Sequence, residues 1–231
     1  MAKKEYLVEL FGRVHQKYDL LNHVLSFYLD KGWRKSLVDQ IETMTVSRIL
    51  DVCTGTCDLA MEFAMRYPEA KVMGIDISDQ MLKIGIIKIN RAHLNGRMLL
   101  QQSDLFHLPF KDGVFEVVSI AFGLRNLHDF RSGIKEMVRV LKKDGLLLIL
   151  ELSLPQVPLL KNVYPFYLKK ILPKIGGLIS GSKSSYAYLS SSIIGFPKRE
   201  EVIELLKAEG LRNITYQGLS GGIASIYRGK K

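Results

Sequence analysis

Short apolar runs alternate with amphipathic stretches along most of the chain, and this alternation predicts strands and helices in turn. Continuous apolar runs of this length are typical of strands buried on both faces of a sheet. They lie at Arg48–Val52, Lys71–Ile75, Met98–Gln102, Val114–Ile120 and Leu146–Leu150. Helical spacing of apolar residues follows at 58–66, from a Ser78 N-cap to about 92, at 130–141 and at 199–208.

The end of the chain changes pattern. Two short strands flank Gly221 and Gly222, which is a hairpin signal. Strands that alternate with helices form βαβ units and a parallel sheet. The fold class predicted from these patterns is therefore α/β, a doubly wound, mostly parallel seven-stranded sheet with a C-terminal antiparallel hairpin.

Two segments stand outside this alternation. The first forty or so residues are helical in pattern, including Tyr18–Leu25, and we expect a helical cap over 1–45. The segment 154–192 is too long for an ordinary connection between a strand and a helix, and it is apolar, aromatic and basic at once. We expect it to form a lid at one end of the sheet. Because no repeat or linker divides the chain, we expect a single domain over 1–231.

Composition narrows the class of protein. Of the 231 residues, 47% are hydrophobic and 24% charged, which excludes disorder as the main state. No run reaches the roughly 18 apolar residues that a membrane span needs. The start, Met1–Glu5, is charged and leads into no apolar core of a signal peptide, so we expect a cytoplasmic protein.

The net charge indicates the kind of binding partner, and the cysteine content indicates the redox compartment. Lys and Arg number 33 against 23 Asp and Glu, giving a net charge of +10, which favours an anionic partner such as nucleic acid, lipid or a charged substrate. Cys53 and Cys57 are the two cysteines. They cannot form a disulfide framework, and their spacing without further ligands does not indicate a metal site. We expect both to be packing residues in a reduced compartment.

Candidate chemistry begins at the turn after the first strand, Asp51-Val-Cys-Thr-Gly-Thr-Cys-Asp58. Gly55 permits a tight turn, and Asp76 follows about 20 residues later, where an acidic residue binds both hydroxyls of a ribose. Dinucleotide sites need three glycines, whereas Thr56 and Cys57 stand at the crowded positions here. The turn therefore favours S-adenosylmethionine (SAM), which has no phosphates, over NAD or FAD.

Two further acidic residues complete the expected cofactor site. Asp51 and backbone groups of the turn can meet the ammonium and carboxylate of SAM. Asp104, after the third strand, can accept from the adenine amino group, beside the apolar side chains of Leu105 and Phe106. Acidic residues at strand ends often only cap helices, but three of them together with Gly55 at successive strand ends favour a ligand site.

Four stretches are more specific than this turn. They are Tyr18-Asp-Leu-Leu-Asn22 with Ser26 and Trp33-Arg34, the SAM turn itself, Ala121-Phe-Gly-Leu-Arg-Asn126 with Asp129, and Tyr164 through Pro173-Lys-Ile-Gly-Gly-Leu-Ile-Ser-Gly181 with Ser185-Tyr-x-Tyr-Leu189. Together they resemble the ubiquinone/menaquinone biosynthesis C-methyltransferases, which methylate polyprenyl quinols with SAM. The resemblance runs nearly end to end and implies a Rossmann-like class I SAM-dependent methyltransferase.

The resemblance implies cofactor contacts at Thr56, Asp76, Asp104 and Leu105. It also implies a polyprenyl quinol substrate, demethylmenaquinol, with the methoxybenzoquinol of ubiquinone biosynthesis as the alternative. The family usually has glycine at positions 54 and 57. We therefore expect the Cys57 side chain to lie beside the amino-acid part of the cofactor and to affect its affinity.

Methyl transfer to a ring carbon needs a phenolate close to the donor. We expect Arg125 to stabilise that phenolate, directly or through a water acting as base, although it could instead pair with Asp129. Asn126 would orient Arg125 or a quinol oxygen. His128 is a candidate base because its usual pKa suits neutral pH, and a solvated histidine at a helix start is the alternative.

We expect the cap and the lid to bind substrate through Tyr18, Asn22, Tyr164 and Tyr167. Lysines interleave with aromatic and aliphatic residues in the lid (Lys169, Lys170 and Lys174), which suits transient contact with an anionic membrane at the inner face of the cell membrane, or a solvated helix face. No motif for nucleic acid is present. A methyltransferase of RNA or another small molecule, a non-catalytic SAM-fold protein, and a monomer or a homodimer stay open.

Overall fold

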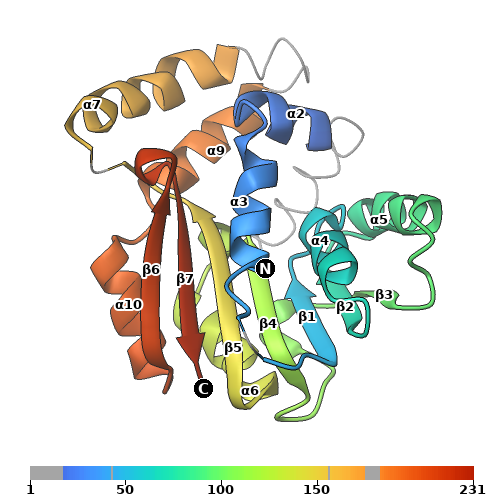
Figure 1. The fold of residues 1–231 in the computed structure, drawn as a ribbon. Coiled ribbons are helices and arrows are strands. Elements are labelled where there is room, and N and C mark those ends of the chain that lie inside the picture. Colours follow the sequence, from blue (N-terminus) through green and yellow to red (C-terminus); the bar gives the residue numbers. More distant parts are fainter. Residues whose placement is uncertain (1–17, 43, 156, 175–182) are drawn as a thin grey trace.

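A seven-stranded sheet forms the centre of the molecule in the computed structural model, which describes residues 18–42, 44–155, 157–174 and 183–231 (Figure 1). Its order is β3-β2-β1-β4-β5-β7-β6. Strands β1 to β5 are parallel, and β7 runs antiparallel to both β5 and β6. The strands are β1 (Arg48–Val52), β2 (Lys71–Asp76), β3 (Met98–Gln102), β4 (Phe115–Ala121), β5 (Leu141–Leu152), β6 (Arg212–Leu219) and β7 (Ala224–Lys230). The predicted fold class is confirmed.

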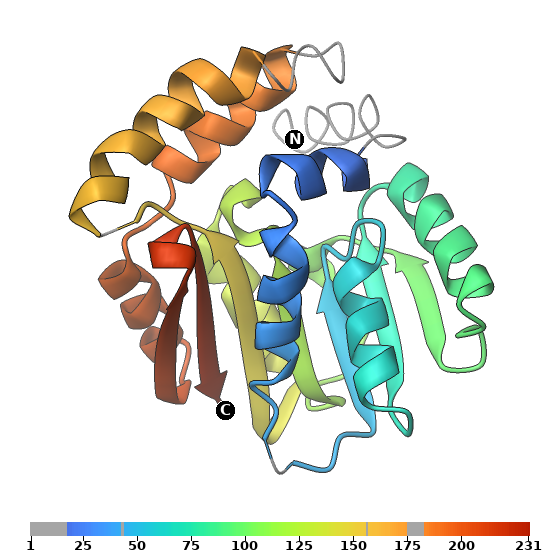
Figure 2. The same cartoon turned by 45° about the horizontal axis from the view of Figure 1, so that its top comes forward.

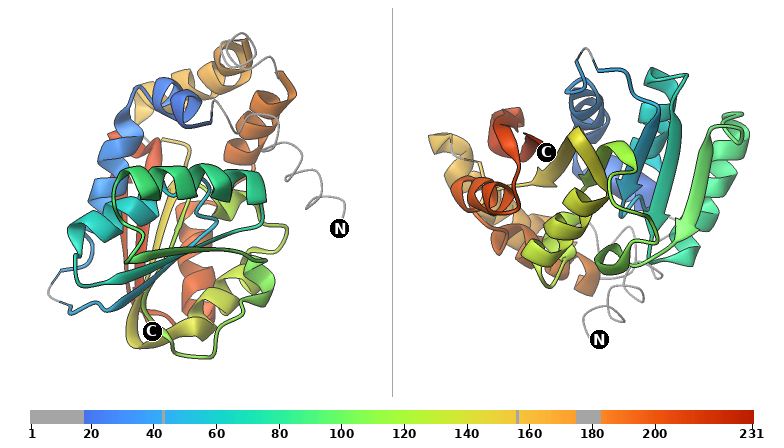
Figure 3. Two further views of the ribbon diagram at one scale, coloured as in Figure 1. Left: turned by 90° about the vertical axis from the view of Figure 1, so that its right-hand side faces the viewer. Right: turned by 90° about the horizontal axis from the view of Figure 1, so that it is seen from below.

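Helices cover both faces of the sheet (Figure 3). One face packs against α3 (Leu29–Val38), α4 (Asp58–Arg66) and α5 (Asp79–Arg91), and the other against α6 (Phe130–Val140) and α10 (Arg199–Ala208). Ser78 caps α5 by accepting from the Met81 N–H, as its position predicts. Strand β5 begins directly after α6, so it is longer than the apolar run alone indicates, and its pairing with β4 shifts register between Phe115 and Val117.

The sheet order reverses between β1 and β4, which are hydrogen-bonded neighbours with Asp51 opposite Ser119. Helices after the two strands pack on opposite faces, so their carboxyl ends leave a crevice at this switch point. The four chemistry-bearing turns predicted from sequence follow β1, β2, β3 and β4, at this edge of the sheet.

Helix α2 (Tyr18–Leu25) of the cap and the lid helices lie beyond the carboxyl ends of the strands, whereas α3 of the cap packs on a face of the sheet (Figure 2). Helix α2 lies between the lid helices and α5, and Trp33 of α3 donates to Ser220 at 2.9 Å. The lid contains α7 (Pro158–Phe166), a π-helical stretch η4 (Tyr167–Ile171) and α9 (Lys183–Ile194), which share a small core of Leu168, Leu172, Tyr186 and Ile193. None of the helices in the described ranges is long and apolar enough to cross a membrane.

Candidate active site

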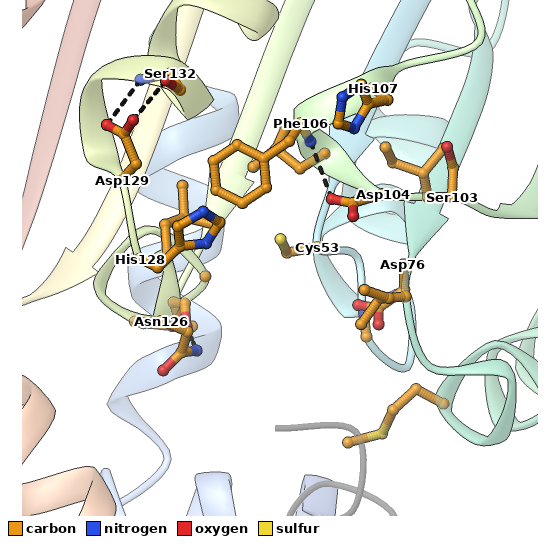
Figure 4. A pocket seen from close by; sticks show the side chains of 18 of the residues that line it. Cys53, Asp76, Ser103, Asp104, Phe106, His107, Asn126, His128, Asp129 and Ser132 are labelled. Carbon is orange, nitrogen blue, oxygen red and sulfur yellow. Dashed lines mark hydrogen bonds between the residues drawn. The ribbon is translucent and has the colours of Figure 1, made fainter. Parts of the chain in front are cut away.

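A cavity of about 750 Å³ opens at the switch point of the sheet (Figure 4). The turns after β1 to β4 all contribute to its wall. Asp76 and Asp104 lie on one side of the cavity, Asn126 and His128 on the opposite side, and Cys53 between them. Apolar side chains complete the wall: Ile75, Ile77, Met81, Leu105, Phe106, Phe122 and Leu127.

The turn after β1 is held against the end of β2. Three of its residues have left-handed backbone conformations, Cys53, Gly55 and Cys57, with φ of 54°, 56° and 71°. The Gly55 N–H donates to Asp76 Oδ2 at 2.9 Å, and the Thr54 N–H donates to the Ile75 carbonyl at 2.9 Å. These bonds place Gly55 and Asp76 together on the cavity wall.

Asp76 is equipped to accept hydrogen bonds from a ribose. Burial raises the pKa of its carboxyl, against the N–H groups of Ser78 and Gly55, which lower it. These two donors, each at 2.9 Å, use part of an acceptor capacity of about four lone-pair sites. The remaining capacity suits the two hydroxyls of a nucleoside.

The turn after β3 forms an apolar slot with one carboxylate. Asp104 caps the short 3-10 helix η2 (Leu105–His107) by accepting from the Phe106 N–H at 3.1 Å. Leu105 is buried, and the Phe106 ring packs on His128 with centroids 4.3 Å apart. An adenine ring requires a slot between apolar side chains with a carboxylate beside it to accept from its amino group. This set of side chains therefore fits SAM.

Two predicted cofactor residues support the turn from behind. Asp51 is buried and accepts from the hydroxyls of Thr54 and Ser119, each at 2.7 Å. Burial raises its pKa to about 6, although both hydroxyls lower it. Thr56 is also buried, and its hydroxyl donates to Asp19 of α2. Both residues adjoin the cavity wall and do not form it, and their direct contact with cofactor stays a prediction.

The expectation that Cys57 lies beside the cofactor is wrong. Its left-handed backbone turns the side chain away from the cavity, into the core against α5. The sulfur fills the space above Gly85, where a Cβ would lie 2.4 Å from it. Cys53 faces the cavity instead, and burial raises the pKa of its thiol. Cys57 is a packing residue, as predicted, so it leaves room for a ligand.

Arg125 forms an ion pair that the sequence did not indicate. It lies in the 3-10 helix η3 (Leu124–Asn126), and its guanidinium pairs with Glu151 of β5, which is fully buried. Glu151 also accepts from the Arg125 N–H at 3.0 Å. The alternative pairing with Asp129 is wrong, because Asp129 instead caps α6 by accepting from the Ser132 N–H at 3.1 Å. A carboxylate ending the apolar run of β5 was the available signal for Glu151.

A second cavity of about 240 Å³ adjoins the first, and Phe122 lines both. It lies between the cap and the lid, and Arg125 faces it. The Arg125 Nε is buried and has no hydrogen-bond partner among the described residues. The other wall residues are largely apolar or aromatic: Asn22, Ser26, Phe27, Leu29, Asp30, Trp33, Leu152, Leu160, Val163, Tyr164, Tyr167, Leu168, Leu172, Leu189, Ile193 and Ile223.

The remaining predicted site residues divide between the two cavities. Asn126 faces the first, and its side chain accepts from the Tyr188 hydroxyl at 3.2 Å. Tyr188 lies in the Ser185–Leu189 stretch of the lid that the sequence analysis singled out, but it was not predicted as a site residue. Tyr164 and Tyr167 stack in the second cavity with centroids 6.0 Å apart, near Asn22. Tyr18 is the first residue of α2, and its side chain lies outside what the structure describes.

Comparison with known proteins finds a matching family and similar chains. A profile of the ubiE/COQ5 methyltransferase family matches residues 1–231. The ubiquinone/menaquinone biosynthesis C-methyltransferase UbiE of Geotalea uraniireducens is 43% identical, over 99% of this chain and 97% of that protein. The demethylmenaquinone methyltransferase of Porphyromonas gingivalis is 39% identical, over 99% of this chain and 94% of that protein.

Solved structures share the fold. A SAM-dependent methyltransferase from Thermotoga maritima, described as a possible histamine N-methyltransferase, aligns with a TM-score of 0.67 over 96% of this chain and 99% of that chain. At 17% sequence identity this likeness concerns the fold alone.

Proposed function

Because this chain belongs to the ubiE/COQ5 methyltransferase family and is a SAM-dependent C-methyltransferase of quinone biosynthesis, we propose that it converts demethylmenaquinol to menaquinol. The observation that carries the proposal is the junction of the two cavities at Phe122. A cavity with two carboxylates on its wall, Asp76 and Asp104, meets a more apolar cavity there, with Arg125 at the boundary. The alternative substrate is the polyprenyl methoxybenzoquinol of ubiquinone biosynthesis.

Residues of the first cavity would hold the cofactor. Asp76 would accept from the ribose hydroxyls, Asp104 from the adenine amino group, and Leu105 would pack on the adenine ring. The Gly55 turn would meet the amino-acid part, with Asp51 and Thr56 fixing its shape. When bound, SAM supplies a methyl group on a positively charged sulfur, which a carbon nucleophile accepts.

Residues at the boundary would make the quinol ring nucleophilic. The Arg125 side chain is positively charged, only 7% exposed, and lines the second cavity, so it would lower the free energy of a phenolate bound there. Glu151 and the Phe122 carbonyl hold this guanidinium in place. Asn126 would orient the ring oxygen, and His128 would take up the hydroxyl proton.

The second cavity would take the start of the isoprenoid tail. Its wall is apolar, and Asn22, Tyr164 and Tyr167 come from the cap (1–45) and the lid (154–192), which we propose enclose the substrate within a single domain. A tail leaving this cavity would emerge between α7 and the turn that joins α2 to α3.

That exit carries exposed apolar and basic side chains, which we call the rim. Phe27, Leu29 and Val163 line the cavity and are exposed, and Tyr28 and Phe166 extend the apolar surface. Lys31, Lys161, Lys169 and Lys170 are exposed on the same segments. Aromatic residues among lysines suit an anionic membrane surface, so we propose that the enzyme works in the cytoplasm and contacts the inner face of the cell membrane during turnover.

An assay with methyl-labelled SAM tests the substrate. Demethylmenaquinol and the demethylated methoxybenzoquinol are presented with tails of equal length, and label in each extracted quinol is measured. We expect label in the naphthoquinol. Preferential labelling of the benzoquinol would establish the alternative, and label in neither would contradict the proposed function.

A further inference from the structure

Helix α2 is attached to the cofactor turn by side chains. Asp19 of α2 accepts from the Thr56 hydroxyl through Oδ1, and its Oδ2 lies 3.0 Å from Lys88 Nζ of α5. Lys88 also pairs with Asp58, the first residue of α4, directly after the turn. Asp19 therefore contacts the turn at Thr56 and also contacts Lys88, which pairs with Asp58 at the end of the turn.

The other end of α2 is also connected to Asp58, through Asp30 and Arg34. His23 Nδ1 lies 2.7 Å from Asp30 Oδ2, and Ser26 donates to Asp30 Oδ1 at 2.8 Å. Asp30 pairs with Arg34, and Arg34 Nη2 lies 3.5 Å from Asp58 Oδ2. Hydrogen bonds and ion pairs thus connect both ends of α2 to Asp58 at the start of α4.

These contacts are more sheltered than ordinary surface ion pairs. The side chains of Asp19 and Lys88 are 29% and 22% exposed, whereas Asp79 and Lys83, which pair on the same helix α5, are 54% and 69% exposed. Sheltered charges are screened less by water and salt, so their interaction is stronger. The Asp79–Lys83 pair is therefore a matched control.

The turn needs such support because two of its residues that carry a side chain, Cys53 and Cys57, adopt left-handed conformations that cost free energy. Asp51 and Asp76 hold it from the sheet side, at Thr54 and Gly55. Asp19 holds it at Thr56, from a helix outside the sheet. The geometry of the turn and the position of α2 therefore depend on one another.

We propose that Asp19 is a positioning residue that couples the docking of α2 to cofactor binding at the turn, so that each event favours the other. Such coupling is reciprocal: SAM should stabilise docked α2 by the same factor by which docked α2 strengthens SAM binding. The inference concerns the cofactor alone and does not depend on which quinol is methylated.

The test compares wild type, Asp19→Asn and the control Asp79→Asn. SAM affinity is measured by calorimetry, and docking by hydrogen exchange of the α2 backbone amides with and without SAM. We expect Asp19→Asn to weaken SAM binding about three- to tenfold, as loss of a hydrogen bond to a charged group does, and to remove the protection that SAM gives α2. Asp79→Asn should behave as wild type in both measurements.

Thr56→Val removes the hydrogen bond between Thr56 and Asp19 from the other side and leaves the Asp19 carboxylate in place. If the Thr56–Asp19 contact carries the coupling, Asp19→Asn should weaken SAM binding less in the Thr56→Val background than in wild type. Unchanged SAM affinity in Asp19→Asn, or α2 exchange in wild type that does not respond to SAM, would overturn the proposal. Quinol methylation at saturating SAM by the variants would leave the proposed function standing in that case.

Discussion

At the residue scale, Cys57 and Gly85 are complementary in size across α4 and α5. A left-handed conformation costs a residue with a side chain about 1–2 kcal/mol, yet the Cys57 sulfur is fully buried in the space that Gly85 leaves. Glycine in the middle of a helix is itself unfavourable. The left-handed Cys57 and the helical Gly85 explain one another, because the absence of a side chain at Gly85 leaves the space that the Cys57 sulfur fills.

This complementarity predicts that Gly85→Ala will destabilise the wild type by about 1–3 kcal/mol, since the new Cβ would lie 2.4 Å from the sulfur. In a Cys57→Gly background the same replacement should be neutral or stabilising, because the sulfur is gone and the remaining close contact, Leu100 Cδ1 at 3.0 Å, is the end of a flexible side chain. Urea unfolding of the four proteins measures the coupling. Gly32→Ala in α3, where a Cβ meets nothing within 4 Å, is the control and should stabilise. Additive effects at positions 57 and 85 would contradict this explanation.

Asp51 predicts a pH effect on stability. Burial raises its pKa to about 6 in the folded protein, above the value near 3.9 of an unfolded chain. The folded state therefore holds this proton more tightly, and its contribution to the free energy of unfolding falls as pH rises from about 4 to about 6. Asp51→Asn cannot ionise, so its stability relative to wild type should improve by on the order of 2–3 kcal/mol across that interval.

Chemical unfolding of wild type and Asp51→Asn at several pH values between 4 and 7 provides the measurement. Burial also raises the pKa of Asp76, so the wild-type profile alone would mix the two carboxyls. The difference between the proteins reports Asp51 together with its repulsion of Asp76. Parallel profiles would show that Asp51 keeps an ordinary pKa in the folded state.

At the scale of elements, most of the fold could be predicted because its signals are local. The bounds of β1, β3, α4 and α10 follow directly from apolar runs, helical spacing and the turn residues between them. The site was predicted less completely. Asp76 and Asp104 reach the cavity because strand ends place them there, whichever way neighbouring side chains turn.

What sequence could not predict depends on side-chain direction and on contacts between distant elements. Cys57 turns into the core because of its backbone conformation. Asp51 turns into the core because the Ser119 hydroxyl of β4 donates a hydrogen bond to it. The Arg125–Glu151 pair joins the turn after β4 to the end of β5, and only the sheet order brings these positions together. Tyr188 reaches Asn126 from the lid in the same way.

The Arg125–Glu151 pair determines how catalysis by Arg125 should be tested. Arg125→Ala would leave a fully buried carboxylate unpaired, which costs about 3–5 kcal/mol, so loss of activity could reflect unfolding. We expect the double variant Arg125→Gln/Glu151→Gln to be more stable than Arg125→Ala, yet to lose about 100-fold or more in kcat because the positive charge is gone. Thermal unfolding and quinol turnover measure the two effects. A double variant with wild-type turnover would remove Arg125 from the mechanism.

At the scale of the whole molecule, we expect the net charge of +10 and the rim to act together in the proposed membrane contact. Apolar side chains at the rim would insert at a membrane surface, while the surrounding positive charge attracts anionic lipid over a distance that salt shortens. The cavity behind the rim would then receive its substrate from the bilayer without an exposed tail. Two features of binding should follow, a dependence on anionic lipid and a dependence on the exposed aromatic residues.

Tyr28→Ser/Phe166→Ser tests the second dependence, because both side chains are exposed on the rim and neither lines a cavity. Losing two aromatic anchors of about 1.5–3 kcal/mol each should lower partitioning to anionic vesicles at least tenfold in sedimentation, while turnover of a short-tailed, soluble quinol stays unchanged. Leu99→Ser, at an exposed position on β3 at the other edge of the sheet, is the control and should bind vesicles as wild type does. Wild-type binding should also weaken as salt rises or as neutral lipid replaces anionic lipid. Equal partitioning of the double variant and wild type would mean that charge alone brings the enzyme to the membrane, and the exposed aromatic residues would need another explanation.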